Sequence, residues 1–123
     1  MDSSFLEVDV FGTTTAGRRV ERFTLNNSNG VMVRLISYGA TVTELHVPDR
    51  KGKLADVVLG FDELGSYETV NPYFGSTVGR VAFRIPDPRF HLDATSFDLA
   101  ANNGPPTSTG CHQAFPRPVL APP

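Results

Sequence analysis

Two arginines four residues apart are the side chains best placed to do chemistry in this sequence. Arg80 and Arg84 lie in an aromatic and β-branched stretch, residues 71–85, which opens with the turn signal Asn-Pro. On a β-strand, alternate residues point to the same side, so both guanidinium groups would share one face. Two cations on one face favour a polar or anionic partner. The alternative is an edge strand that uses charge to prevent pairing with other strands.

The other titratable side chains form no recognisable catalytic or metal-binding motif. His46, His91 and His112 lack the spacing of metal ligands, and His46 and His91 are expected to be half-exposed structural residues on strands. The single cysteine, Cys111, excludes an internal disulfide and has no His/Asn pattern around it. Residues 75–79 lack the Lys-Ser/Thr pair that follows a phosphate-binding loop. We therefore expect no metal site.

The composition is typical of one soluble globular domain. The chain has 123 residues, of which 40% are hydrophobic and 20% charged, and a net charge of -2 argues against nucleic acid as the main partner. No apolar run approaches the roughly 20 residues that span a bilayer, so no membrane partner is expected. The first four residues lack the pattern of a secretory signal. We expect a cytoplasmic protein.

Hydrophobic alternation predicts a chain made of short strands. The clearest alternating stretches are residues 5–11, 19–25, 31–36 and 41–47. The Asn-Gly pair at residues 29–30 favours a hairpin, because both residues accept positive φ. The small residues of Tyr38-Gly39-Ala40 indicate a bulge or a close approach of backbones.

The second half of the chain predicts one buried strand, one short helical turn and two further short strands. Residues 55–61 are compact and apolar and predict a strand buried on both faces, and residues 62–68 predict one short helical turn capped by Asp62. Residues 89–93 and 96–100 predict two short strands around a turn. Many short strands and almost no helix favour an all-β sandwich or barrel.

The composition changes near residue 104 and predicts a domain boundary. Residues 1–104 carry the alternation, whereas residues 105–123 contain six prolines in nineteen positions and show no periodicity. Proline fixes φ and removes a backbone donor, so this tail is expected to be disordered or loosely attached. An ordinary proline-rich surface segment is the alternative.

Several stretches together resemble one family. Residues 36–42, ISYGATV, resemble its "ISYGATI" segment, and residues 56–61 repeat its "DVVLGF". Residues 71–85 resemble its "PYFG…GRVANRI", and residues 100–105 resemble the segment before its "SLHGG". In order and spacing, from about residue 5 to 105, the chain is similar to the N-terminal part of the aldose 1-epimerases, or galactose mutarotases.

The resemblance implies a fold, a reaction and a partner. The fold would be part of a galactose-mutarotase-like β-sandwich of short antiparallel strands. The family interconverts the α and β anomers of aldoses such as galactose and glucose, so a small sugar is the implied partner, and it uses no cofactor. A carboxylate removes the proton of the anomeric hydroxyl while a histidine protonates the ring oxygen. Positioned acid–base catalysis of this kind contributes about 10²–10⁴ in rate.

The resemblance also assigns the candidate substrate-binding residues and shows where the sequence departs. Arg84 matches the arginine of the family's sugar-contacting Asn-Arg pair, but Phe83 replaces the asparagine. Phe83 could be a core residue or could stack on a sugar face. Losing the asparagine hydrogen bond would cost roughly 0.5–1.5 kcal/mol of binding. The "SLHGG" histidine should fall near Thr109, and His112 is three residues late.

The family's catalytic histidine and glutamate lie beyond the matched segment. We therefore expect a truncated chain without catalytic residues and without activity of its own. Two alternatives remain open, namely a non-catalytic carbohydrate-binding or interaction module and the non-functional product of a shortened transcript. Part of a sandwich leaves unpaired strand edges, through which the chain could self-associate.

Overall fold

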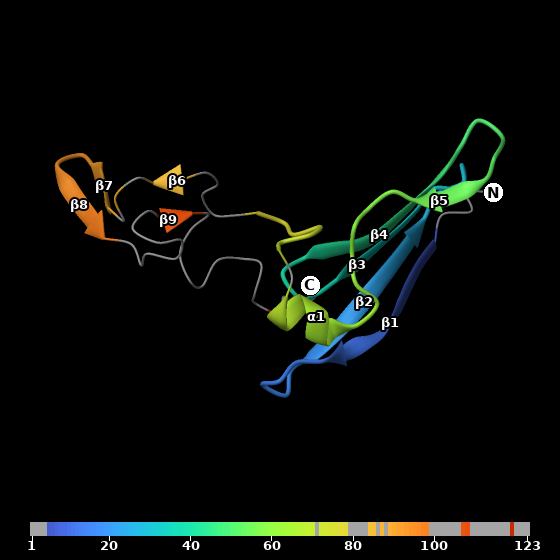
Figure 1. The fold of residues 1–123 in the computed structure, drawn as a ribbon, viewed down its shortest axis with the longest axis horizontal. Helices are drawn as coiled ribbons and strands as arrows, with labels where there is room; N and C mark the ends of the chain where they lie inside the picture. Colours follow the sequence, from blue (N-terminus) through green and yellow to red (C-terminus); the bar gives the residue numbers. More distant parts are fainter. Residues whose placement is uncertain are drawn as a thin grey trace.

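The fold is seen in a computed structural model that describes residues 5–70, 72–78, 84–85, 87, 89–98, 107–108 and 119. Figure 1 shows the arrangement, in which a five-stranded sheet is the largest element. Its strands are β1 (Phe5–Thr13), β2 (Arg19–Asn26), β3 (Met32–Ile36), β4 (Thr41–Pro48) and β5 (Leu54–Asp56). They lie in sequence order, and each pair of neighbours is antiparallel. The four alternating stretches of the sequence are thus confirmed as strands β1–β4.

Tight turns join these strands and set their register. In the β2–β3 hairpin, the Asn27 side-chain oxygen accepts hydrogen bonds from the backbone N–H groups of Asn29 (3.0 Å) and Val31 (2.9 Å). The predicted hairpin is confirmed, but only Gly30 has positive φ (81°) and Asn29 does not, so the loop is not the two-residue turn with two positive φ values that Asn-Gly favours. Between β3 and β4, Gly39 and Ala40 both have positive φ (67° and 46°). Residues 38–40 therefore form a turn with left-handed backbone. The register shift of the β3–β4 pair, which marks a bulge, lies instead between Arg34 and Leu35.

The sheet has two chemically different faces. Residues opposite each other in the register point to the same side, so the pairing assigns each side chain to a face. One side carries the residues that we call the charged face: Asp9, Arg22, Arg34, Glu44, His46 and Asp56. The other side carries the residues that we call the apolar face: Leu6, Val8, Val10, Phe23, Leu25, Val33, Leu35, Leu45 and Val47. Glu21 lies on the same side, opposite Val10, and forms an ion pair with Arg19 at 3.6 Å.

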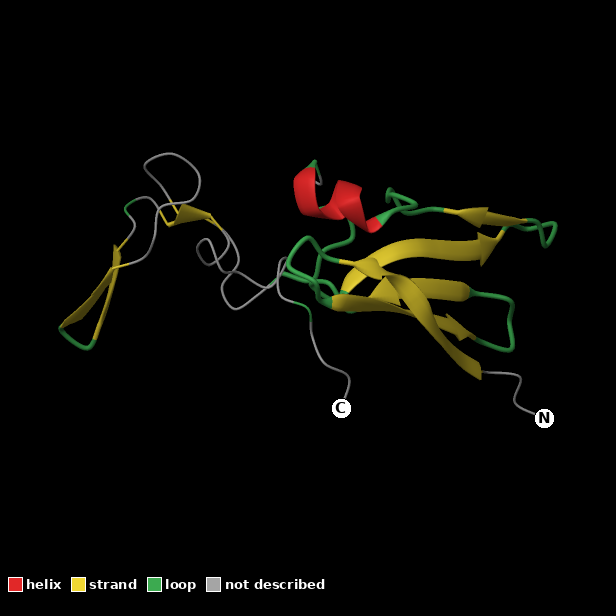
Figure 2. Cartoon of the chain, turned by 90° about the horizontal axis from the view of Figure 1, so that it is seen from below, coloured by secondary structure: helices red, strands yellow, loops and turns green. Residues whose placement is uncertain are grey.

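The core lies on the side of the charged face, beneath α1 (Leu64–Thr69). Its buried members are Val20, Ile36, Tyr38, Leu64 and Tyr67, and Figure 2 shows the helix on this one side of the sheet. A side chain added at Gly12 would place its Cβ 3.1 Å from Leu64, so glycine lets the helix approach β1 closely. The helix therefore covers one end of this side and leaves the charged residues beside it.

Two expectations for residues 55–68 are wrong. The predicted strand buried on both faces is instead the short exposed β5, and Val57 and Leu59 are 59% and 70% exposed. The Asp56 side chain accepts a hydrogen bond from Val58 N–H, which turns the chain away after three residues of pairing. The predicted short helical turn is confirmed as α1, but the expected cap is wrong, because the N-cap is Glu63 rather than Asp62 and makes no side-chain capping bond.

The remaining elements are two small antiparallel pairs. β6 (Arg84–Ile85) pairs with β9 (Thr107–Ser108), and β7 (Arg89–Leu92) pairs with β8 (Thr95–Asp98). The β7–β8 hairpin confirms the two short strands predicted there, and Phe90 stacks on Phe97 with centroids 5.1 Å apart. All the described sheets are antiparallel, so the predicted all-β class is confirmed.

Two parts of the proline-rich tail are among the described residues. Thr107–Ser108 forms β9, which pairs with β6. Val119 forms an isolated bridge with Tyr38, accepts a hydrogen bond from Arg18 Nη2 at 3.2 Å and packs against the core. The other residues of the tail lie outside those the structure describes, so the boundary at residue 104 remains a prediction. In the described part of the chain, no helix is long and apolar enough to cross a membrane.

Candidate functional site

The predicted sugar-contacting residues fall at the margin of what the structure describes. Arg84 lies on β6, where its backbone is paired with Ser108. Its side chain and the whole of Phe83 lie outside the described residues, as do Arg80 and His112. The assignment of Arg84 and Phe83 to substrate binding therefore remains a prediction from the resemblance.

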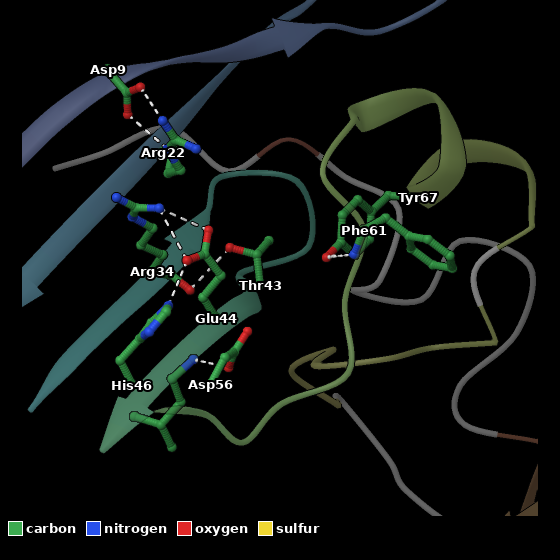
Figure 3. Close-up of polar contacts among 10 residues, drawn as sticks. Asp9, Arg22, Arg34, Thr43, Glu44, His46, Asp56, Phe61 and Tyr67 are labelled. Carbon is green, nitrogen blue, oxygen red and sulfur yellow. Dashed lines mark hydrogen bonds and ion pairs between the residues drawn. The ribbon is translucent and has the colours of Figure 1, made fainter. Parts of the chain in front are cut away.

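The charged face is a feature that the sequence reasoning missed. Its six side chains come from all five strands of the main sheet, as Figure 3 shows for each of them. Antiparallel pairing places Asp9 opposite Arg22, Arg34 opposite Glu44, and His46 opposite Asp56. The alternation of Glu44 and His46 on one strand was visible in the sequence. The residues that lie opposite Glu44 and His46 depend on the pairing register of neighbouring strands, which the sequence of one strand does not reveal.

At one end of the charged face, Asp9 and Arg22 form a bidentate ion pair. Arg22 Nε donates to Asp9 Oδ1 at 3.0 Å, and Arg22 Nη2 donates to the other carboxylate oxygen. This hydrogen bond is the main reason that the pKa of Asp9 is lowered and the pKa of Arg22 is raised. The guanidinium also lies over the Phe11 ring, 5.7 Å from its centroid.

In the middle of the charged face, Glu44 is held by two partners. Arg34 Nη1 donates to both of its carboxylate oxygens (2.9 and 3.0 Å), and His46 Nε2 lies 2.8 Å from Oε2. Partial burial acts to raise the pKa of Glu44, but the hydrogen bonds from His46 and Arg34 outweigh it and lower the pKa. Thr43 Oγ1 also donates to the backbone carbonyl of Arg34 at 3.3 Å.

At the β5 end of the charged face, Asp56 links β5 to β4 and to the loop that follows β5. Its Oδ1 accepts hydrogen bonds from the backbone N–H groups of Leu45 (2.9 Å) and Val58 (3.1 Å), and the bond from Leu45 is the main cause of its lowered pKa. The ligand atoms of Glu44, His46 and Asp56 all lie within 4.8 Å of one another. Such groups are able to bind Zn²⁺, but Arg34 already occupies both oxygens of Glu44. In this arrangement Glu44 is bound by Arg34 and His46, and Asp56 accepts hydrogen bonds from backbone N–H groups, so the side chains link β3, β4 and β5.

A second cluster joins the stretches on which the family resemblance rests. Residues 72–78 lie against β4, because Val42 N–H donates to the Gly75 carbonyl (2.9 Å) and Thr77 Oγ1 donates to the Ala40 carbonyl (2.6 Å). Gly60 approaches Thr43 so closely that an added Cβ would lie 2.5 Å from its carbonyl oxygen.

Aromatic side chains hold the same cluster together. Phe61 stacks on Phe74 with centroids 5.9 Å apart and meets Tyr67 edge to face at 5.3 Å. Phe61 N–H donates to the Tyr67 hydroxyl at 2.9 Å, and burial raises the pKa of that hydroxyl. The motif segments 36–42, 56–61 and 72–75 are thus one packed unit at the α1 end of the sheet.

Comparison with known proteins defines the class first by fold. The galactose 1-epimerase from Lactobacillus acidophilus NCFM superposes with a TM-score of 0.77 at 21% identity, over 95% of this chain and 33% of that one. A GalM/aldose epimerase homologue from C. elegans superposes with a TM-score of 0.69 at 29% identity, over 95% of this chain and 31% of that one. The sheet architecture is therefore that of a galactose-epimerase β-sandwich.

Sequence comparison then gives the family. The sequence profile of the aldose 1-epimerases matches residues 21–113. Galactose mutarotase from Bos taurus is 46% identical over 114 residues, which are 92% of this chain and 33% of the relative. The chain belongs to the aldose 1-epimerase family, and it spans about a third of the length of the curated relatives that it matches.

Proposed function

We propose that this chain serves carbohydrate metabolism by binding an aldose of the galactose or glucose type, with Arg84 as its main contact to the sugar. The observation that carries the proposal is the family match over residues 21–113, which includes the position of Arg84. The packing of the three motif segments around β4 supports it, because they form one unit from which residues 79–85 continue. The proposal places the protein in the cytoplasm, with neither nucleic acid nor membrane as a partner.

The proposed function of this chain is sugar binding without catalysis. Anomer interconversion in the family needs a carboxylate at the anomeric hydroxyl and a histidine at the ring oxygen, and both residues lie beyond the segment matched here. Among the described residues, His46 is engaged by Glu44 and His91 is exposed on the β7–β8 hairpin. We infer that a polypeptide of these 123 residues binds the sugar but does not supply the acid–base step.

Polarimetry of freshly dissolved α-galactose tests the catalytic part. We expect the purified 123-residue chain to give the same rate of mutarotation as buffer, with bovine galactose mutarotase as the active control. A rate that rises in proportion to the concentration of the chain would overturn this part. An alanine substitution at His46 would then show whether the described histidine takes part.

A further inference from the structure

The hairpin between β2 and β3 places an asparagine directly before a flexible glycine. Asn29 and Gly30 are both exposed in its loop, and Gly30 has φ of 81° with nothing within 4 Å of an added Cβ. This open space leaves the backbone nitrogen of Gly30 uncrowded on that side. The loop joins two strands that are consecutive in the chain and paired with each other, so its geometry is set locally.

The hydrogen bonds of the loop hold its two asparagines differently. The Asn27 side chain is engaged, because its oxygen accepts hydrogen bonds from the N–H groups of Asn29 and Val31. Among the described residues, no group binds the side-chain amide of Asn29. Gly30 N–H donates to the Asn27 carbonyl at 3.3 Å, which is longer than the usual distance of about 2.9–3.0 Å. The Asn29 amide and the Gly30 nitrogen are therefore the lightly held groups of this loop.

We propose that Asn29 is a site of spontaneous deamidation, in which the Gly30 backbone nitrogen and a water molecule convert it into aspartate and isoaspartate. The nitrogen loses its proton and attacks Asn29 Cγ. A bond forms between these two atoms, the Cγ–Nδ2 bond breaks, and Nδ2 leaves with a proton as ammonia. The product is a five-membered succinimide ring, in which the Gly30 nitrogen is bonded to both carbonyl carbons of residue 29.

Water then opens the succinimide at either carbonyl carbon. Attack at Cγ breaks the bond from Cγ to the Gly30 nitrogen and gives aspartate with an ordinary backbone. Attack at the backbone carbonyl carbon breaks its bond to the same nitrogen and gives isoaspartate. No group is oxidised or reduced, and water is the only co-reactant.

Isoaspartate alters the hairpin, because the chain then passes through the side-chain carbons of residue 29. This route lengthens the backbone between Asn27 and Val31, so the two hydrogen bonds to Asn27 Oδ1 lose their present geometry. Either product also places a carboxylate in a loop that has no other charged side chain. We expect the pairing of Asn26 with Met32, directly beside the loop, to weaken.

Peptide mapping by mass spectrometry tests the proposal on the whole 123-residue chain, kept folded in mildly alkaline buffer. Trypsin releases residues 23–34, because one arginine precedes this stretch and another ends it. The peptide excludes the other Asn-Gly pair, residues 103–104, and holds three asparagines, Asn26, Asn27 and Asn29. Fragment spectra locate the mass gain that accompanies replacement of the amide NH₂ by OH. We expect this gain at Asn29, with the other two amides retained.

Two alanine variants with the same backbone strain give the matched comparison. Gly30→Ala adds a Cβ beside the attacking nitrogen, whereas Gly52→Ala makes the same change in the β4–β5 turn, at φ of 79° and again with nothing within 4 Å. The deamidation rate at Asn29 should fall about tenfold in Gly30→Ala, because the Cβ crowds ring closure. It should be unchanged in Gly52→Ala. Circular dichroism shows whether each variant keeps its sheet, and Gly30→Asp offers a second test, since aspartate accepts a left-handed backbone better than alanine.

Three results would overturn the proposal. If Asn29 keeps its amide in the folded chain, the hairpin does not support the reaction, and conversion of the urea-unfolded chain would then show that the fold protects this residue. Equal conversion at Asn27 would show that the hydrogen bonds of the loop do not distinguish the two asparagines. A rate in Gly30→Ala equal to that of the wild type would exclude the Gly30 nitrogen as the attacking group.

Discussion

At the scale of single residues, the charged face shows how a sheet accommodates partly buried charge. Each carboxylate in it has a donor within hydrogen-bond distance, and Glu44 and Asp56 each have two donor residues. Partly buried charges that are paired in this way cost little, whereas removing one partner leaves the other uncompensated. The cluster therefore contributes to stability as long as all of its partners are present.

The pH dependence of unfolding follows from the lowered pKa of Glu44. Its pKa in the folded chain lies below the ordinary value of 4.5, so it contributes stability above about pH 4.5. That stability is lost as the pH falls through the folded-state pKa. We expect the free energy of unfolding, measured by urea titration, to decrease below about pH 4.5.

A pair of amide substitutions isolates the contribution of Glu44. Glu44→Gln removes the titrating group beside Arg34 and His46 and should reduce the slope of stability against pH in this window. Asp62→Asn, at an exposed carboxyl in the loop before α1, is the matched control and should leave the slope unchanged. Equal slopes for wild type and Glu44→Gln would contradict the account of the charged face.

At the scale of elements, the attachment of residues 72–78 to β4 is the step that packs the family motifs together. Gly75 has φ of 64°, and a Cβ placed on it would lie only 1.8 Å from the Val42 carbonyl oxygen. Gly52 has φ of 79° in the β4–β5 turn, with nothing within 4 Å of an added Cβ. The two glycines share a left-handed backbone and differ only in the space around them.

Alanine substitutions at these glycines separate backbone strain from steric conflict. Gly52→Ala should cost about 1–2 kcal/mol, the price of a left-handed conformation. Gly75→Ala should cost about 2–3 kcal/mol, because it also breaks the hydrogen bond from Val42 N–H to the Gly75 carbonyl. Urea unfolding measures both values, and equal losses would show that residues 72–78 are not held against β4.

Sequence patterns predicted elements well where the two sides of a strand differ chemically. β1–β4 were found because their alternation reflects the difference between the two sides of the sheet. The pattern failed at residues 55–61, where an apolar run suggested a buried strand. There, Asp56 binds backbone N–H groups of both its own loop and β4, and this contact ends the strand. Where the strand ends depends on the Asp56 side chain and on the pairing register of β4 and β5. Hydrophobic periodicity predicts neither of them.

At the scale of the whole molecule, family and fold could be predicted from the sequence, whereas the site could be predicted only in part. The order of short motifs identified the aldose 1-epimerase family, which the profile match and the fold confirm. Glu44, His46 and Asp56 were not recognised as a cluster, because only the hairpin register brings Asp56 beside Glu44 and His46, which precede it by ten or more positions. Arg84 was assigned through the motif alone, and its role in sugar binding remains a prediction.

The most direct test of the central claim is a titration of the isotope-labelled chain with galactose, followed by NMR chemical shifts. Wild type and Arg50→Ala, a change in the exposed β4–β5 turn, should show the same saturable shifts. Arg84→Ala should weaken binding by about tenfold to a hundredfold, since a charged hydrogen bond contributes about 1.5–3 kcal/mol. Saturable binding of equal affinity in Arg84→Ala and wild type, or no saturable binding by the wild type, would contradict the account.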